Sequence, residues 1–159
     1  MAILTNSATS SPAQALAERV AAKMFAADAA SQALGMRIVA VRPGYSSVEM
    51  DIRPDMLNGH ATCHGGIIFT LADSALAFAC NSRNFTTVAA GCSIEFLHPC
   101  HLGDKLVAEA TEISLQGKTG LYDITVTNQH GRCVALFRGR SHRIQGEVVI
   151  PDDSSHRVV

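Results

Sequence analysis

Asp73 is the only charged residue in the apolar stretch from His64 to Asn81, which reads HGGIIFTLADSALAFACN. An isolated charge in an apolar helix is costly, so such a carboxylate is usually paired, protonated or catalytic. The residues three and four positions away are apolar or small: Phe69, Thr70, Leu76 and Ala77. We therefore expect poor solvation and a pKa above the ordinary ~3.9. Such a carboxylate can act as a general base on water or as a nucleophile.

Glycines and polar residues lead directly into this stretch, in the order Asn58-Gly59-His60-Ala61-Thr62-Cys63-His64-Gly65-Gly66. The Gly65 amide would lie in the first helical turn, where N–H groups lack intrahelical partners and the helix dipole favours negative charge. That position suits a developing oxyanion. Glycine at 65 and 66 would also let a bulky substrate approach the backbone. The sequence therefore predicts an active site at this helix start.

Each residue also has a simpler interpretation. Asp73 could be a structural carboxylate that is hydrogen-bonded across a subunit interface. Asn58 before Gly59 could form only a turn, and His64 could cap the helix rather than take part in the chemistry.

Metal and cysteine chemistry are the other options in this region. Residues of metal-binding types form two groups, His60 with Cys63 and His64, and His98 with Cys100 and His101. Their spacings match no common zinc site, so we expect no metal. Cys63 beside His64 leaves a cysteine nucleophile open in principle.

Length and composition limit the class of protein. A chain of 159 residues with a net charge of -1 fits one domain and gives no broad attraction for nucleic acid or an anionic membrane. Five cysteines without a CxxC pair argue against a disulfide framework and favour a reducing cytoplasm. The first residues lack the features of a secretory signal, and the apolar stretch is shorter than the ~20 residues a bilayer requires. It is therefore expected to be a core helix.

The remaining pattern predicts an α+β fold. Ser11 and Pro12 predict the start of a first helix over 12–33. An arm at 36–41 and a strand ending near Ile52 form a half-buried pair, followed by the central helix to Asn81. Strands are then expected at about 86–97, 104–115, 120–128 and 133–143. Because Tyr122, Ile124 and Val126 alternate with polar residues, the sheet should be antiparallel and covered on one face.

The spacing within the central helix predicts a subunit partner. Eight residues from Gly65 to Asp73 correspond to about 12 Å along a helix. One carbonyl carbon cannot meet both residues within one chain. A two-fold partner with an antiparallel helix could place Asp73 of one subunit opposite Gly65 of the other, which predicts a homodimer with two equivalent sites.

Several motifs together resemble a known family over most of residues 36–146. They are Asn58-Gly59, His64-Gly65-Gly66, Leu71-Ala72-Asp73, Ala79-Cys80-Asn81-Ser82, Ser93-Ile94-Glu95-Phe96-Leu97, Gly103-Asp104, Gly120-Leu121-Tyr122-Asp123 and the segment 134–143. The chain resembles the hotdog-fold acyl-CoA thioesterases, and most closely their PaaI-type branch of phenylacetate degradation. The resemblance implies a long central helix wrapped by a curved antiparallel sheet. It divides the chain into an N-terminal helical extension at 1–34, a hotdog thioesterase domain at 35–146 and a tail at 147–159.

The resemblance also assigns roles to residues. It implies that Asp73 is the catalytic carboxylate, Gly65 the amide donor to the thioester carbonyl, and Asn58 and His64 supporting polar groups. We expect Gly66 and Thr70 to contact the substrate.

Basic residues near the end of the chain are candidates for binding the phosphates of coenzyme A. Arg138 and Arg140 share one face of the last predicted strand, and Arg143 and Lys118 are further candidates. The alternative is that they only solvate the edge of a strand.

The function implied is hydrolysis of (hydroxy)phenylacetyl-CoA or a related acyl-CoA to the free acid and coenzyme A, without cofactor or metal. The family also implies a dimer of dimers in many members. A noncatalytic acyl-CoA-binding or sensing protein is the main alternative, and a dehydratase on the same fold would need an acid/base histidine. Some relatives carry a hydroxyl residue after the helix that orients water, whereas Val88-Ala89-Ala90 supplies none here and Ser93 lies further along. Positioning of water would then fall to Asn58 or the backbone.

Overall fold

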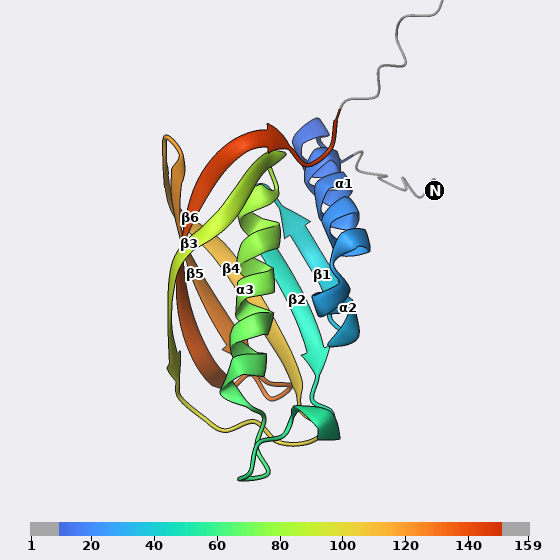
Figure 1. Ribbon diagram of the computed structural model, residues 1–159, viewed down its shortest axis with the longest axis vertical. Helices are drawn as coiled ribbons and strands as arrows, with labels where there is room; N and C mark the ends of the chain where they lie inside the picture. Colours follow the sequence, from blue (N-terminus) through green and yellow to red (C-terminus); the bar gives the residue numbers. More distant parts are fainter. Residues whose placement is uncertain (1–9, 151–159) are drawn as a thin grey trace, which may run out of the picture.

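A curved, six-stranded antiparallel sheet forms the body of the protein, as shown by a computed structural model that describes residues 10–150 (Figure 1). Its strands are β1 (Arg37–Arg42), β2 (Tyr45–Asp51), β3 (Phe85–Phe96), β4 (Lys105–Gln116), β5 (Thr119–Thr127) and β6 (Cys133–Glu147). They lie in the order β1-β2-β4-β5-β6-β3. The predicted α+β architecture, with an additional N-terminal helix, is confirmed.

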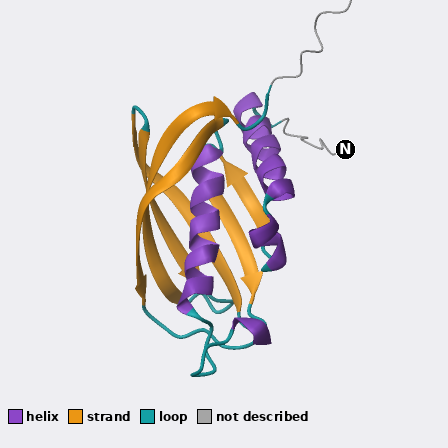
Figure 2. Cartoon of the chain, viewed as in Figure 1, coloured by secondary structure: helices purple, strands orange, loops and turns teal. Residues whose placement is uncertain are grey.

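Helix α3 (Gly65–Asn81) lies against the inner face of this sheet (Figure 2). Its bounds are those expected from the apolar stretch. The side chains that it buries are mostly apolar, including Ile68, Leu71, Leu76 and Phe78, and they meet inward-facing strand residues such as Met50, Leu106, Ile124 and Phe137. Contact with the sheet is close, because any side chain at Gly139 of β6 would collide with Leu76. Burial of this apolar face holds α3 on the sheet.

The N-terminal segment forms two helices instead of the single helix predicted over 12–33. Helix α1 (Pro12–Ala27) begins at Ser11, whose Oγ accepts a hydrogen bond from the Gln14 amide at 3.2 Å. Asp28 has non-helical backbone angles, and its carboxylate caps α2 (Ala29–Ala33) by accepting from the Ser31 amide at 3.0 Å. The continuous helix was therefore wrong, because Asp28 is more stable as a cap than inside a helix. Helix α1 lies alongside α3, next to β1 (Figure 1).

The C-terminal boundary differs slightly from expectation. Strand β6 continues to Glu147, beyond the predicted end at 143. The side chain of Asn84 then exchanges hydrogen bonds of 2.9 and 2.7 Å with the backbone of Val149, which holds this segment against the domain. Residues 151–159 of the predicted tail lie outside the described residues, and the predicted division into extension, domain and tail stays a prediction. Within residues 10–150, no helix has the length and apolar character needed to cross a bilayer.

Candidate active site

The first turn of α3 presents a free backbone donor. His64 is the N-cap, and its Nδ1 accepts a hydrogen bond from the Gly66 amide at 2.9 Å. Nδ1 therefore carries no proton in this arrangement, and the ring proton is on Nε2. The Gly65 N–H has no acceptor among residues 10–150, so it can donate to a ligand at the positive end of the helix dipole. The capping role of His64 is thus observed, while its contact with substrate stays a prediction.

The loop before α3 is ordered by Asn58. Its Oδ1 accepts from the amides of His60 and Thr62 at 2.9 and 3.3 Å, and its Nδ2 donates to Thr62 Oγ1 at 3.0 Å. Asn58 therefore does form the turn that its type suggests. Because this turn leads directly into His64, Asn58 helps to position the start of α3.

Asp73 is half-buried two turns further along α3. Its carboxylate has no hydrogen-bond or ion-pair partner among the described residues, and burial raises its pKa, as expected. The Thr70 hydroxyl donates to the Gly66 carbonyl at 2.8 Å rather than to Asp73. A desolvated carboxylate without a partner is able to accept a proton from water or to attack an electrophile.

Gly65 and Asp73 cannot meet one reacting atom within one chain. Helix α3 is uninterrupted between them, so eight residues separate them by about 12 Å. That a two-fold partner brings Asp73 of one subunit opposite Gly65 of the other stays a prediction.

A cleft of about 350 Å³ lies beside Gly65 and is bordered by Cys63, Phe96 and Leu97. A Cβ atom built on Gly65 would lie 3.0 Å from Cζ of Phe96, and one on Gly66 would lie 3.1 Å from Nδ1 of His64. A side chain at either glycine would therefore make the neighbouring ring shift by a few tenths of an ångström, and the contact of both glycines with substrate stays a prediction. The sequence reasoning gave Phe96 no role. The one feature of the sequence that could have pointed to Phe96 is a large aromatic residue at the end of a strand. Its side chain is 53% exposed.

The cysteine and metal alternatives find no support in this cleft. The Sγ of Cys63 donates to its neighbour's carbonyl at 3.7 Å, and burial raises its pKa to about 11, so little thiolate forms near neutral pH. The Nδ1 of His64 is already bonded to Gly66 and is not paired with this thiol. In the part of the chain from 10 to 150, no cluster of three or more His, Cys, Asp or Glu side chains is arranged to hold a metal ion.

Arg138 and Arg140 share the outer face of β6, as predicted, because buried residues alternate with them on the inner face. Two nitrogens of Arg138 donate to the Asp123 carboxylate at 2.6 and 2.7 Å. Arg140 donates to the Ala90 carbonyl at 2.9 Å. Both side chains thus have partners within the chain, and their binding to phosphate stays a prediction.

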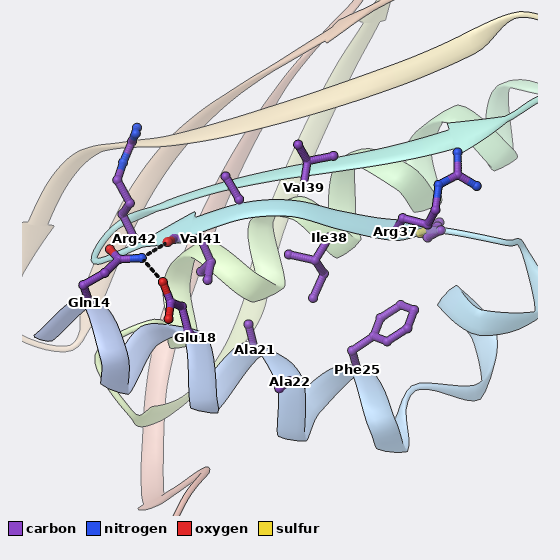
Figure 3. Close-up of a pocket in the computed structure, with 12 residues that line it drawn as sticks. Gln14, Glu18, Ala21, Ala22, Phe25, Arg37, Ile38, Val39, Val41 and Arg42 are labelled. Atoms are coloured by element: carbon purple, nitrogen blue, oxygen red, sulfur yellow. Dashed lines mark hydrogen bonds between the residues drawn. The ribbon is translucent and has the colours of Figure 1, made fainter. Parts of the chain in front are cut away.

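A larger cavity, of about 750 Å³, lies between α1 and β1 and contains none of the predicted site residues (Figure 3). Its floor is apolar, with Ala21, Phe25 and Ile38 among its side chains. At one end, Gln14 donates to the Val41 carbonyl at 2.8 Å. Size alone does not identify a catalytic site, and the predicted catalytic residues Gly65 and Asp73 lie on α3 instead.

Comparison with known proteins identifies the family. A family model described as "Thioesterase superfamily" matches residues 60–135, which include Gly65 and Asp73. Acyl-coenzyme A thioesterase PaaI of Escherichia coli (strain K12) is 49% identical over 126 residues, covering 79% of this chain and 89% of that protein. The solved structure of the E. coli PaaI protein from the phenylacetic acid degradation operon has a TM-score of 0.83 and 46% identity, covering 84% of this chain and 97% of that chain. A Streptococcus mutans protein solved bound to acetyl CoA has a TM-score of 0.67 and 29% identity, covering 70% of this chain and 90% of that chain.

The fold and these relatives define a thioester hydrolase with the hotdog fold. The chain belongs to the thioesterase superfamily, in the PaaI-type branch of hotdog-fold acyl-CoA thioesterases, which confirms the resemblance found in the sequence.

Proposed function

We propose that the protein hydrolyses aryl-acetyl-CoA thioesters, such as phenylacetyl-CoA and hydroxyphenylacetyl-CoA, to the free acid and coenzyme A. The observation that carries the proposal is the combination, on one helix, of the Gly65 N–H and the half-buried Asp73 carboxylate, neither of which has a partner in the described part of the chain. The relatives support the substrate class: one is named an acyl-coenzyme A thioesterase and belongs to a phenylacetic acid degradation operon, and another was solved with acetyl CoA.

In this mechanism the thioester carbonyl oxygen accepts a hydrogen bond from the Gly65 N–H. Negative charge develops on that oxygen during attack, and one such donor is typically worth about 10²–10³ in rate. The helix dipole adds to this stabilisation, because Gly65 opens α3.

Asp73 supplies the second function. As a general base it would take a proton from the attacking water, and the proton would then pass to the departing thiolate of coenzyme A. As a nucleophile it would form a mixed anhydride that water opens, with the same products. Asn58 orders the loop and His64 caps the helix start, and together they present the Gly65 amide. The segment Val88-Ala89-Ala90 after the helix has no hydroxyl that could orient water.

A homodimer completes the site in this proposal, because the two groups lie about 12 Å apart in one chain. Strand β3 supports the assembly. Among residues 10–150 it is an edge strand that pairs only with β6, and it exposes apolar side chains, including Val88 and Phe96. A long apolar edge of this kind readily pairs with another chain. A two-fold dimer would then set Asp73 of one subunit opposite Gly65 of the other.

Thiol release tests the proposal. Purified protein and the near-isosteric variant Asp73→Asn are compared on phenylacetyl-CoA and a small panel of aliphatic acyl-CoAs, after both are shown to have the same oligomeric state. If the wild type releases thiol and the variant does not, Asp73 is supported as a catalytic residue. The panel then ranks the acyl groups by rate. Saturable binding by both proteins without thiol release would instead support a noncatalytic acyl-CoA-binding protein. The dimer of dimers, the cytoplasmic location and the lack of a cofactor stay predictions.

A further inference from the structure

Strand β3 runs antiparallel to helix α3, and two contacts fix where the two elements meet. At one end, a Cβ atom built on Gly65 would lie 3.0 Å from the ring of Phe96. At the other end, the side-chain amide of Asn81 donates to the Thr87 carbonyl at 2.9 Å and accepts from the Thr87 amide at 2.9 Å. The start of β3 therefore lies beside the last turn of α3, and the end of β3 lies beside the first turn.

Asp73 and Cys92 are the residues midway between these two contacts. Asp73 lies halfway along α3, at about 12 Å from Gly65 for a rise of about 1.5 Å per residue. Cys92 precedes Phe96 on β3 by about 13 Å, for a rise of about 3.3 Å per residue. Because the two spacings match, Cys92 comes level with Asp73 across the space between β3 and α3.

The side chain of Cys92 is on the face of β3 that is turned toward α3. Side chains alternate along a strand, so Cys92 shares a face with Ile94, which packs against the core, and with Phe96. Its partner on β6 is Gly139, where any side chain would collide with Leu76 of α3. Cys92 is also exposed, and its thiol is free. A molecule that occupies the space beside Asp73 can therefore reach it.

The electrostatics agree with this placement. Burial raises the pKa of the Cys92 thiol, and the negative charge of Asp73 raises it further. Burial also raises the pKa of Cys80 on α3 to about 12, and the charge of Asp73 adds to that shift. These two thiols are the titratable groups on which the Asp73 charge acts.

Charged side chains of the other elements packed on α3 lie elsewhere. Among residues 10–150, burial alone shifts the pKa of Asp73, so no charged group acts on its carboxylate. Glu112 of β4 accepts from Tyr122 of β5 and from Arg83, which follows the end of α3. Arg138 of β6 is on the outer face of the sheet, and α1 contacts α3 through aromatic rings. Cys92 is therefore the polar group that faces Asp73 from the sheet.

A thiol suits a position beside a reactive carboxylate. Cysteine behaves as a small, nearly apolar side chain with a weak S–H donor. A hydroxyl in its place would donate a strong hydrogen bond to the ionised carboxylate, which would lower the pKa of the carboxyl and its basicity. A longer side chain would fill the space that water and the thioester need.

We propose that Cys92 is a positioning residue for Asp73, an inference that rests on the proposed function. Its thiol forms the wall of the site opposite the carboxylate, where it keeps water from one side of Asp73 without supplying a strong donor. Cys92 itself takes no proton and forms no bond to the substrate. It acts through Asp73, which is the group that takes the proton from water or attacks the thioester.

Two substitutions of Cys92 should shift the acid midpoint of kcat/KM for phenylacetyl-CoA in opposite directions. Cys92→Ser introduces a strong donor and should lower the midpoint by about half a pH unit, whereas Cys92→Asp introduces a like charge and should raise it by about one unit. Ser93→Asp is the matched control. It adds the same charge one residue further along β3, but Ser93 is opposite Arg138 on the outer face, so the midpoint should stay at the wild-type value. All variants are first shown to have the wild-type oligomeric state.

Carbon-13 NMR tests the same contact without any activity. The Cβ resonance of Cys92 is titrated at alkaline pH in the wild type and in Asp73→Asn, and it is assigned by its absence from Cys92→Ser. The pKa of the Cys92 thiol should be lower in Asp73→Asn, because the neighbouring negative charge is gone.

Equal acid midpoints in the wild type, Cys92→Ser and Cys92→Asp would overturn the proposal, and so would an unchanged Cys92 pKa in Asp73→Asn. Equal shifts in Cys92→Asp and Ser93→Asp would also overturn it, because added charge alone would then explain the effect. If the wild type releases no thiol from any acyl-CoA, the proposed function is wrong, and the NMR titration still decides whether Cys92 faces the Asp73 carboxylate.

Discussion

Replacing Gly65 with alanine perturbs the proposed oxyanion donor without removing its N–H. The new Cβ would lie 3.0 Å from Cζ of Phe96 and 3.4 Å from the two neighbouring ring carbons. The ring must therefore move by a few tenths of an ångström, which its 53% exposure permits. Alanine also suits the helical backbone at this position and stabilises by about 0.4–1 kcal/mol through the unfolded state. The cost of moving the ring and the stabilisation by alanine nearly cancel, so Tm should change by no more than about 4 °C.

Activity should respond far more strongly than stability. The added methyl group and the displaced Phe96 ring occupy the approach to the Gly65 N–H, and a misplacement of about 1 Å at a reacting centre can cost about 10²-fold in rate. We therefore expect kcat/KM for phenylacetyl-CoA to fall by about 10²-fold in Gly65→Ala. Thiol release gives the kinetic values, and calorimetry gives Tm.

Two further variants make this prediction specific. Gly59→Ala is the control, because a Cβ there meets nothing within 4 Å, and it should retain wild-type kcat/KM. Adding Phe96→Leu to Gly65→Ala should recover part of the lost activity, since it removes the ring that the methyl group meets. Wild-type kcat/KM in Gly65→Ala would refute the assignment of the Gly65 N–H as the donor.

Three further predictions concern Asp73 and His64. Because burial raises the Asp73 pKa, the stability that its protonation contributes is fully present below the ordinary 3.8 and is lost as pH rises through the raised value. In thermal unfolding, Asp73→Asn should therefore have a higher Tm than wild type at pH 7 and match wild type below pH 3.8. Because the ionised carboxylate is the reactive form, kcat/KM for phenylacetyl-CoA should fall at acidic pH with a midpoint above 3.8. A midpoint at or below 3.8 would contradict the catalytic role of Asp73. His64→Ala should lower the free energy of unfolding by about 1 kcal/mol, because it removes the N-cap of α3, whereas His64→Asn should retain most of that stability. Equal unfolding midpoints for the two variants in urea would argue against the cap.

The central helix was predictable because its signals are local. One apolar run, two glycines after a polar loop and a single carboxylate define α3, and its bounds match the expected 65–81. The strands followed in the same way from alternation, as at Tyr122 and Ile124. The break at Asp28 was missed, since an alanine-rich run continues on both sides of that residue.

The partners of side chains could not be predicted, because they depend on contacts between distant segments. The ring of Phe96 reaches Gly65 across the space between β3 and α3. Arg138 meets Asp123 only because β5 and β6 pair in one register, and Lys118 joins Arg143 for the same reason. The sequence therefore predicted which residues are chemically suited to the site, and the structure supplies the contacts within one chain.

Complementation between two inactive variants tests the shared active site most directly. Asp73→Asn and Gly65→Ala chains are co-expressed with different affinity tags, and the mixed dimer is purified through both. In that dimer one site combines the intact Asp73 of one chain with the intact Gly65 of the other, and the second site carries both substitutions. We predict that the mixed dimer recovers about half of the wild-type kcat for thiol release. Activity no higher than that of the two parent variants would contradict a site formed between subunits.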